Sequence, residues 1–307
     1  MLDLIIIGGG PAGMTAGVYA ARKKLKTLML TKDIGGQAAW SSDVENYPGF
    51  TMIKGVELAE KFEHHLEQFS DVIELRLVNS GVNNIEKVAN YFVVTTADKK
   101  TTHARAVIIA SGKLPRPLGV PGEKEFLNKG VTYCAWCDGP LFAGKDVVIV
   151  GGGNSALDAA LNIEKSVKSI IMINITKELT GDAAMIDKIK TAPHVRVLNN
   201  TEVSEIVGDT FVTGIKISEI GKKETHLLET NGVFIEAGSL PATDYLKGFI
   251  KLNRGGEIII NSENMTSVEG IYAAGDITDI PEKQIVVAAG EGAKAAICAA
   301  KYIARFT

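Results

Sequence analysis

The sequence predicts an α/β protein made of two similar units, each a parallel sheet covered by helices. The chain has 307 residues, of which 46% are hydrophobic and 32 are glycine, a composition that suits doubly wound sheets. A glycine-rich turn between a short apolar run and a helical stretch occurs at residues 8–13, and the same pattern recurs at residues 151–156. This internal repeat predicts two Rossmann-like dinucleotide-binding units. Two dinucleotides are then expected, unless one turn is a vestige.

The first unit begins with a strand at Leu4–Ile7, followed by the glycine-rich turn and a helix through about Lys24. A second strand at Thr27–Leu30 leads to Asp33. A glycine-rich turn can also serve packing alone. The order of strand, turn, helix and strand favours dinucleotide binding over that interpretation.

Each glycine of the first turn has its own expected task. Gly8 makes the tight turn, Gly10 lets the backbone approach a pyrophosphate, and Gly13 permits close packing of helix on strand. The start of the helix supplies free N–H groups to the phosphates. Asp33 is placed to accept a hydrogen bond from a ribose hydroxyl.

The segment that follows carries a loop, a helix and several strands. The loop over residues 35–49 is rich in glycine and amide side chains, and it either simply connects two elements or hydrogen-bonds the polar edge of a flavin ring. The predicted helix and four strands are Gly55–Phe69, Ile73–Val78, Gly81–Lys87, Tyr91–Thr96 and Ala106–Ala110. Prolines at positions 115, 117 and 121 then predict a hinge or a domain crossing.

Two cysteines, Cys134 and Cys137, stand just before the second glycine-rich turn and are followed by Asp138. Two thiols at this spacing close and reopen a small disulfide, and a nearby helix start favours the thiolate form of one of them. A zinc site would need four ligands, but the only other cysteine is Cys298 and no pair of histidines has the required spacing. We therefore interpret the pair as redox-active and expect no metal, with a structural disulfide or a metal site as the alternatives.

The second unit repeats the first, with a strand at Asp146–Val150, the turn, a helix to about Glu164 and a strand at Ser169–Ile173. A helix and then strands are predicted at Met185–Lys190, His194–Leu198, Glu202–Val207, Val212–Ile217, His226–Thr230, Asn231–Gly238, Gly255–Ile260 and Gly270–Ala274. Asp276 follows the last strand as a simple turn acid or as an acceptor for ribityl hydroxyls. A helix over 284–305 would direct its positive end at a reduced flavin.

Composition and charge exclude several classes of function. A formal net charge of −3 provides no general attraction for nucleic acid or an anionic membrane. No apolar run reaches membrane-spanning length, and the chain enters a strand at once without the features of a signal peptide. Three cysteines favour a reducing compartment over a secreted disulfide scaffold. We expect a cytoplasmic protein that binds neither nucleic acid nor a membrane.

Together these motifs resemble those of the low-molecular-weight thioredoxin reductases, a family of flavin disulfide reductases. They are also similar to the reductase portion of the alkyl hydroperoxide reductase flavoprotein. The resemblance covers essentially the whole chain and rests on residues 8–13, 35–37, 45–49, 134–139, 151–156, 275–276, 283–284 and 290–292. It implies an FAD domain of residues 1–114 and 246–307, interrupted by an NAD(P) domain of residues 115–245, and a homodimer.

The resemblance also assigns roles to individual residues. It implies that Cys137 exchanges electrons with the flavin, that Cys134 attacks the partner disulfide, and that Asp138 protonates the departing thiolate. The two domains would alternate between orientations, with one hinge near Pro115. FAD contacts are implied at Gly8, Gly10, Pro11, Ala12, Gly13, Lys32, Asp33, Gly36, Gln37, Asn46, Val82, Ala110, Gly112, Gly275, Asp276, Lys283, Gln284 and Ile285. NAD(P) contacts are implied at Gly151, Gly153, Asn154, Ser155 and Asn174.

One departure from the family concerns the electron donor. Relatives that use NADPH carry a His-Arg-Arg run and a further Arg after the second strand of the nicotinamide domain. Here Asn174, Ile175 and Thr176 occupy the run and Thr180 the further position, so no arginine grips a 2′-phosphate. NADH is therefore expected over NADPH, although Lys177 is a nearby cation, and ferredoxin or another flavin is an alternative donor.

Several functions fit these motifs. The leading hypothesis is reduction of thioredoxin or a glutaredoxin-like protein. A peroxiredoxin system is the second; its relatives carry an additional N-terminal thioredoxin-like domain, so a separate carrier would be needed. A dithiol oxidase that uses oxygen is the third, and a redox-sensing flavoprotein without turnover is the fourth. Trp136, between the cysteines, is bulkier than the residue often found there and is a candidate for altered partner choice.

Overall fold

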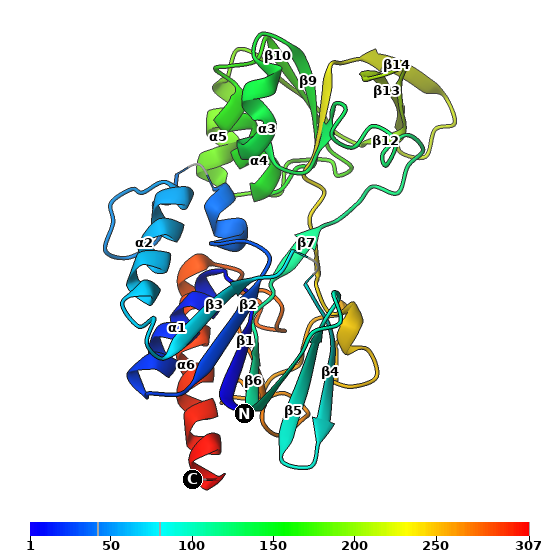
Figure 1. The fold of residues 1–307 in the computed structure, drawn as a ribbon. Helices are drawn as coiled ribbons and strands as arrows, with labels where there is room; N and C mark the ends of the chain where they lie inside the picture. Colours follow the sequence, from blue (N-terminus) through cyan, green and yellow to red (C-terminus); the bar gives the residue numbers. More distant parts are fainter. Residues whose placement is uncertain (42, 80, 307) are drawn as a thin grey trace. The chain divides into compact units, whose positions relative to one another are not determined.

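The computed structural model describes residues 1–41, 43–79 and 81–306, and it divides into two compact units (Figure 1). Unit 1 comprises Met1–Leu114 and Leu240–Thr307, and unit 2 comprises Pro115–Ser239, so unit 2 is inserted into unit 1. The chain leaves unit 1 through β7 (Lys113–Pro115) and returns through β16 (Ser239–Pro241), and these two strands pair with each other. The return falls earlier than residue 246 because the Ala242 N–H already donates to Gly112 O of unit 1.

Unit 1 is built on one mixed sheet with the strand order β3-β2-β1-β6-β5-β4, and β17 pairs with β6. Five of its strands are parallel: β1 (Leu2–Ile7), β2 (Thr27–Thr31), β3 (Ile73–Leu77), β6 (Thr101–Ile109) and β17 (Ile271–Ala273). The antiparallel extension consists of β4 (Val82–Val88) and β5 (Tyr91–Thr96). The parallel part is the scaffold on which a dinucleotide-binding turn is expected at the carboxyl ends of the strands.

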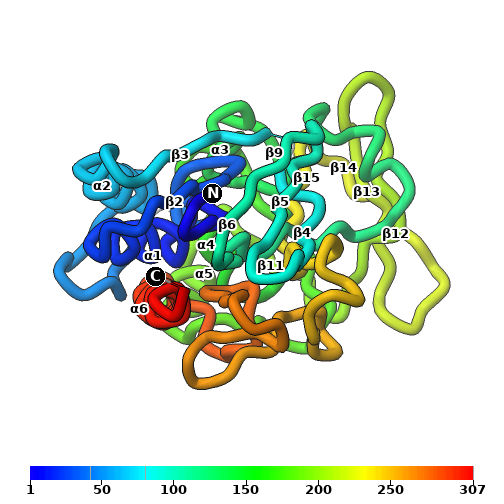
Figure 2. The backbone as a smooth tube through the Cα atoms, turned by 60° about the horizontal axis from the view of Figure 1, so that its bottom comes forward, coloured from blue at the N-terminus to red at the C-terminus, as the bar shows by residue number. Residues whose placement is uncertain are grey.

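Helices α1 (Pro11–Arg22) and α6 (Ile285–Ile303) lie side by side against this sheet (Figures 1 and 2). Small residues allow the close approach: a Cβ added at Gly292 would stand 2.0 Å from Ala12 O. Helix α2 (Gly55–Glu67) packs against α1 and a short 3-10 helix at Gly36–Trp40. One apolar cluster fills the space between α1, α6 and the sheet, and a second covers the opposite face.

Unit 2 contains a fully parallel sheet with the order β11-β10-β9-β15-β8. Its strands are β8 (Val131–Thr132), β9 (Asp146–Val150), β10 (Ser169–Ile173), β11 (Val195–Leu198) and β15 (Gly232–Ile235). Its helices are α3 (Ala135–Asp138), α4 (Asn154–Ile163) and α5 (Ala183–Thr191). An antiparallel sheet is formed by β12 (Thr201–Gly208), β13 (Val212–Glu219) and β14 (Thr225–Glu229).

One predicted strand is wrong. Residues Gly255–Ile260 form no strand; Ile258 makes only isolated bridges to Leu252 and Thr278. The Asn253 side chain explains the difference, because its Oδ1 accepts from the N–H groups of Gly255 at 2.8 Å and Glu257 at 3.0 Å. Such a local turn satisfies the backbone groups that a strand ladder would otherwise use.

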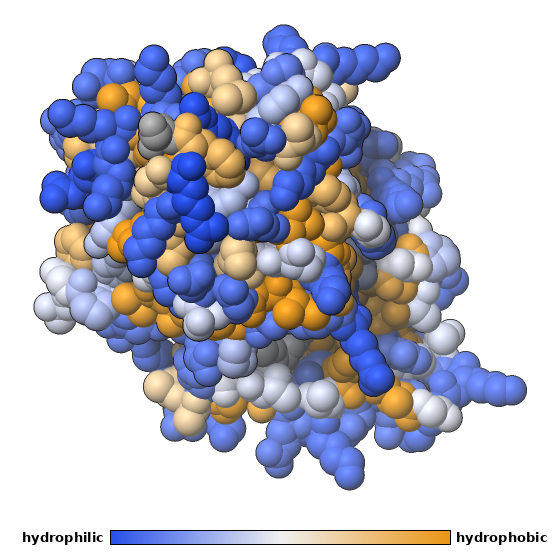
Figure 3. Space-filling view, turned by 90° about the horizontal axis from the view of Figure 1, so that it is seen from below, coloured by the Kyte–Doolittle hydropathy of each residue, from blue (hydrophilic) through white to orange (hydrophobic). Residues whose placement is uncertain are grey.

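Three further observations concern membrane-spanning helices, metal sites and the surface. Within the described residues, no helix combines the length and apolar character needed to cross a bilayer. The same residues hold no cluster of His, Cys, Asp and Glu side chains that would bind a metal ion. On the face shown in Figure 3, hydrophilic side chains dominate the outline and hydrophobic ones gather nearer the middle.

Candidate active site and nucleotide-binding turns

Cys134 and Cys137 form a disulfide at the first turn of α3, with their Cα atoms 5.3 Å apart. The buried strand β8 delivers the chain to this turn, where Cys134 is the N-cap in an extended conformation. Cys134 Sγ accepts from the Cys137 N–H at 3.1 Å. Cys137 is exposed and Cys134 is half-buried, so the disulfide can be reached from solvent.

Asp138 is held in a short hydrogen-bond chain beside the disulfide. The Thr132 hydroxyl donates to Asp138 Oδ2, and Thr132 Oγ1 accepts from the Cys134 N–H at 3.1 Å. Thr132 is buried and ends β8, so the sheet fixes both the acid and the backbone of the first cysteine. Thr132 belongs to none of the sequence motifs, so its role becomes visible only in the fold.

A buried carboxylate fixes the segment that leads into the disulfide. Glu123 is 3% exposed, and it accepts from the N–H groups of Leu118 at 2.9 Å and Gly119 at 2.6 Å. The Tyr133 hydroxyl also donates to Glu123, at 2.5 Å. Burial first, and then this carboxylate, raise the pKa of Tyr133, which keeps the phenol neutral. Tyr133, the residue before Cys134, is therefore held in place by the buried Glu123.

The second glycine-rich turn has the shape that a dinucleotide requires. Gly151 has φ +149°, and a Cβ there would stand 2.2 Å from Glu236 O. A Cβ at Gly152 would stand 2.3 Å from Asn174 Oδ1, whereas at Gly153 the nearest atom would be 3.8 Å away. The backbone at Gly153, just before α4, is thus open to a phosphate group.

Asn174, at the end of β10, is 3% exposed. Its Nδ2 donates to Thr176 O at 3.2 Å, Glu178 O at 3.0 Å and Asn199 Oδ1 at 2.8 Å, and its Oδ1 accepts from the Thr176 hydroxyl at 2.9 Å. The amide is fully used in shaping the loop over residues 174–180. In a similar way, Asn154 Oδ1 accepts a hydrogen bond from the Asp182 N–H at 2.7 Å.

Glu236 bonds both to the helix that follows the second glycine-rich turn, α4, and to the helix of the cysteine pair, α3. The Ser155 hydroxyl donates to Glu236 Oε2, and the Ala135 N–H of α3 also bonds the carboxylate. Burial raises the pKa of Glu236, and the charge of Asp158 raises it further. The hydrogen bonds from Ser155 and Ala135 lower it, and the net pKa is about 7. In the sequence, Glu236 is only one residue of the predicted strand Asn231–Gly238.

The first glycine-rich turn, in unit 1, has the same geometry. Gly8 has φ +115°, and a Cβ there would stand 2.1 Å from Ala110 O. A Cβ at Gly13 would stand 1.9 Å from Gly8 O, so a side chain would separate helix from strand. At Gly10 the nearest atom would be Gly35 O at 3.9 Å, which leaves the backbone open.

Two amide side chains from the loop over residues 35–49 connect distant segments of unit 1. Gln37 Nε2 donates to Lys113 O at 2.9 Å, and Asn46 Nδ2 donates to Gln284 Oε1 at 3.0 Å. The predicted FAD contacts of this loop and of the start of α6 therefore come together. Gly112 is open, with no atom within 4 Å of a Cβ built on it.

Two lysines share one carboxylate in the same region. Lys113 Nζ lies 3.0 Å and Lys283 Nζ 3.2 Å from Glu257 Oε1, and the three side chains are 14%, 24% and 20% exposed. Burial raises the pKa of Glu257, but hydrogen bonds from Asn253 and both lysines lower it to about 2. Burial also raises the pKa of Asp276, while the two lysines lower it.

The remaining predicted FAD residues lie around the first turn. The Asp33 carbonyl accepts from the Thr31 hydroxyl at 2.7 Å. A Cβ at Gly81 would stand 2.6 Å from Lys32 Cε, so Lys32 covers the start of β4. The other positions are Pro11 and Ala12 in the first turn of α1, Gly36 in the 3-10 helix, Val82 in β4, Gly275 after β17, and Ile285 at the start of α6.

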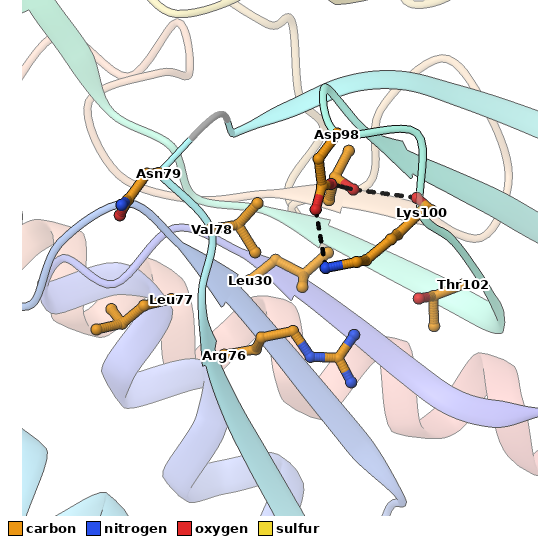
Figure 4. Close-up of a pocket in the computed structure, with 9 residues that line it drawn as sticks. Leu30, Arg76, Leu77, Val78, Asn79, Asp98, Lys100 and Thr102 are labelled. Carbon is orange, nitrogen blue, oxygen red and sulfur yellow. Dashed lines mark hydrogen bonds and ion pairs between the residues drawn. The ribbon is translucent and has the colours of Figure 1, made fainter.

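These features fit FAD. Gly10 and Gly112 leave bare backbone where a ligand can approach, and Asp276 is a half-buried carboxylate without a hydrogen-bond partner among the described residues. A polar cavity of about 270 Å³ elsewhere in unit 1 is a separate feature, because none of the predicted site residues lines it (Figure 4). Its cations are already paired, Lys100 with Asp98 at 2.9 Å and Arg76 with Glu74 at 2.5 Å.

Two dinucleotide-binding units and a reactive disulfide define a class of protein, the FAD-dependent oxidoreductases that act on disulfides. The chain belongs to the pyridine nucleotide-disulphide oxidoreductase family, which it matches over residues 2–292. Together with the solved structures below, this match confirms the predicted family, the α/β fold with two Rossmann-like domains, and the class of enzyme.

Solved structures give a closer comparison. The chain is similar to Lactococcus lactis thioredoxin reductase in its FR conformation, with a TM-score of 0.94, 32% identity, and 99% of this chain and 100% of that chain covered. For T. acidophilum thioredoxin reductase the TM-score is 0.90 and the identity 40%, with 100% of this chain and 99% of that chain covered.

Among relatives by sequence, one of the subunits of the alkyl hydroperoxide reductase of Staphylococcus aureus strain MRSA252 is 38% identical over 303 residues. The match covers 99% of this chain and 59% of the relative, so the chain spans only part of that protein's length.

Proposed function

We propose that the chain is a disulfide reductase of the thioredoxin reductase type. It would pass electrons from a reduced nicotinamide, through FAD and the Cys134–Cys137 disulfide, to thioredoxin or a glutaredoxin-like protein. The observation that carries the proposal is the solvent-accessible disulfide at a helix start, in the same unit as a complete glycine-rich turn. A disulfide with a purely structural role would need neither exposure to solvent nor an acid such as Asp138 beside it.

The residues around the disulfide support a division of labour. Cys134 is the N-cap of α3, a position that favours a thiolate, so it is the nucleophile proposed to attack the partner disulfide. Asp138, held by Thr132, is the group proposed to return a proton to the departing thiolate. Cys137 closes the pair again as the partner leaves.

The residues of unit 1 would hold FAD, which supplies the electron pair that opens the disulfide. Gly8, Gly10 and Gly13 would cradle its pyrophosphate at the start of α1, and Asp276 would accept from its ribityl hydroxyls. Gln37 and Lys283 would supply polar groups to the flavin edge. In unit 2, the turn at residues 151–155 would hold the nicotinamide dinucleotide.

NADH is the proposed nicotinamide donor. The loop over residues 174–180 has no arginine, and Asn174 is consumed within the loop, so no bidentate cation faces a 2′-phosphate. Anaerobic titration with NADH and NADPH separately tests this. Bleaching of the flavin by NADH alone supports the proposal, bleaching by NADPH alone contradicts it, and bleaching by neither contradicts it in favour of ferredoxin or another flavin.

The overall proposal is tested by steady-state reduction of thioredoxin with the single variants Cys134→Ser and Cys137→Ser. Both should lose turnover by more than about a thousandfold, because each removes one sulfur of the exchanging pair. Cys298→Ser, at a buried cysteine outside the pair, is the matched control and should keep full turnover. Full activity in both pair variants, or peroxide formed from a dithiol without any nicotinamide, would contradict the reductase assignment.

A second candidate is the reductase of a peroxiredoxin system, which the 38% identity to part of an alkyl hydroperoxide reductase favours. The two candidates are separated by adding a peroxiredoxin with and without a thioredoxin-like carrier. Peroxide consumption only with the carrier supports a role in which this chain reduces the carrier. We also assign the protein to the cytoplasm as a homodimer, and light scattering of the purified protein tests the dimer.

A further inference from the structure

Glu236 joins the two functional segments of unit 2. It directly follows β15, and its N–H donates to Val150 O at 2.8 Å, which continues the pairing with β9. Its carboxylate accepts from the Ser155 hydroxyl in the first turn of α4 and from the N–H of Ala135, which follows Cys134 in the chain. The Glu236 side chain therefore contacts both the start of α4, which follows the glycine-rich turn, and the start of α3, which carries the cysteine pair.

The charge that acts on Glu236 is negative and comes from Asp158 of α4. Helix α3, which also bonds Glu236, carries Asp138 with the cysteine pair, and Asp138 is bonded to Thr132. No ion pair to Glu236 is found among the described residues. Burial together with Asp158 outweighs the hydrogen bonds from Ser155 and Ala135, and the pKa of the carboxyl group is raised from 4.5 to about 7.

We propose that Glu236 is a positioning residue that couples dinucleotide binding at residues 151–155 to thiolate formation at Cys134, because its carboxyl group bonds the starts of both α4 and α3. A bound pyrophosphate and a Cys134 thiolate are both negative, so each favours the protonated form of this carboxyl group. The coupling rests on the proposed function for the identity of the two sites. It is reciprocal: a bound pyrophosphate neutralises Glu236 by proton uptake, and neutral Glu236 then opposes the Cys134 thiolate less.

The first test is binding of ADP-ribose, a dinucleotide fragment that carries no electrons, to the flavin-containing enzyme at about pH 6 and about pH 8. Wild-type affinity should fall about threefold to tenfold over this range as Glu236 ionises, since one pH unit of linked protonation is a factor of about ten. Glu236→Gln keeps the shape without the charge, and its affinity should change less than about twofold. Glu229→Gln, on the exposed face of β14, is the control and should follow the wild type.

The second test follows the thiol itself. In a Cys137→Ser background, the alkylation rate of Cys134 by iodoacetamide should rise about threefold to tenfold at about pH 8 when Glu236→Gln is added, because a like charge is removed. Asp158→Asn should move the midpoint of the ADP-ribose pH profile to lower pH, since Asp158 raises the pKa of Glu236.

Two outcomes overturn the coupling. In the first, Glu236→Gln keeps the wild-type pH profile and thiol rate. In the second, it weakens ADP-ribose equally at both pH values, as a purely structural residue would. Failure of NADH and NADPH to reduce the disulfide in the wild type would instead contradict the proposed function, and the binding and alkylation measurements would still decide the role of Glu236.

Discussion

The shared carboxylate of Glu257 provides the sharpest stability prediction. Its pKa of about 2 in the folded chain, against 4.5 as the ordinary value, corresponds at about 1.4 kcal/mol per unit to about 3 kcal/mol of stability at neutral pH. Glu257→Gln should therefore lower the free energy of unfolding of unit 1 by about 3 kcal/mol at pH 7, because two partly buried ammonium groups lose their common partner. Asp276 is a carboxylate on which both Lys113 and Lys283 act, and it would remain beside them.

The sign of the pH dependence follows from the lowered pKa. The stabilisation is complete above about pH 4.5 and is lost as pH falls toward about 2, so the gap between wild type and Glu257→Gln should shrink to about 1.4 kcal/mol at pH 3. Urea unfolding in a Trp136→Phe background measures it, because Trp40 is then the only tryptophan and reports unit 1. Glu60→Gln, an exposed carboxylate on α2, is the control, with a change within about 0.5 kcal/mol.

A double-mutant cycle with Lys113→Met isolates the ion pair. In that background Glu257→Gln should cost about 1 to 2 kcal/mol less than in the wild type, because one of the two ammonium partners is already gone. A cost of Glu257→Gln below about 1 kcal/mol at pH 7, or an equal cost at pH 3, would show that the two lysines do not hold the carboxylate in its charged form.

Three further predictions concern the turns and the redox pair. Gly8→Ala should abolish retention of flavin, measured by absorbance after gel filtration, because its Cβ would stand 2.1 Å from Ala110 O at a positive φ; a yellow variant would contradict this. Asn174→Ala should weaken ADP-ribose binding by about tenfold in calorimetry, since the loop loses several hydrogen bonds, and unchanged affinity would count against it. Thr132→Val should slow thioredoxin reduction about threefold to tenfold through misplacement of Asp138, while the urea midpoint moves little; an unchanged rate would exclude that role.

Local patterns made the two turns and the cysteine pair predictable. Gly8 and Gly151 each abut the carbonyl of the residue that follows the neighbouring strand, and this constraint is visible in the sequence as a spaced run of glycines. The pair Cys134 and Cys137 carries its chemistry in its spacing alone. For these elements the residue type and its position in the chain are sufficient evidence.

Long-range partners could not be predicted in the same way. Glu257 meets Lys113 across 144 positions of sequence, and Ser155 meets Glu236 across 81. A charged residue in a loop shows no periodicity that would identify its partner, so only the fold brings such groups together. The wrong strand at Gly255–Ile260 has a local cause instead, because the Asn253 side chain, two and four residues away, competes with the strand ladder for the backbone N–H groups.

The repeat itself argues for a special role of Glu236. In each unit, the first glycine of the turn abuts the carbonyl of the residue that follows the neighbouring central strand: Gly8 meets Ala110 after β6, and Gly151 meets Glu236 after β15. Two residues further on, Gly112 and Gly238 both have positive φ and open space around them. Unit 1 forms this cradle with alanine, so binding a dinucleotide does not require an acid at this position. The acid occurs in the unit that also carries the disulfide, and this is the unit in which a charge can link one site to the other.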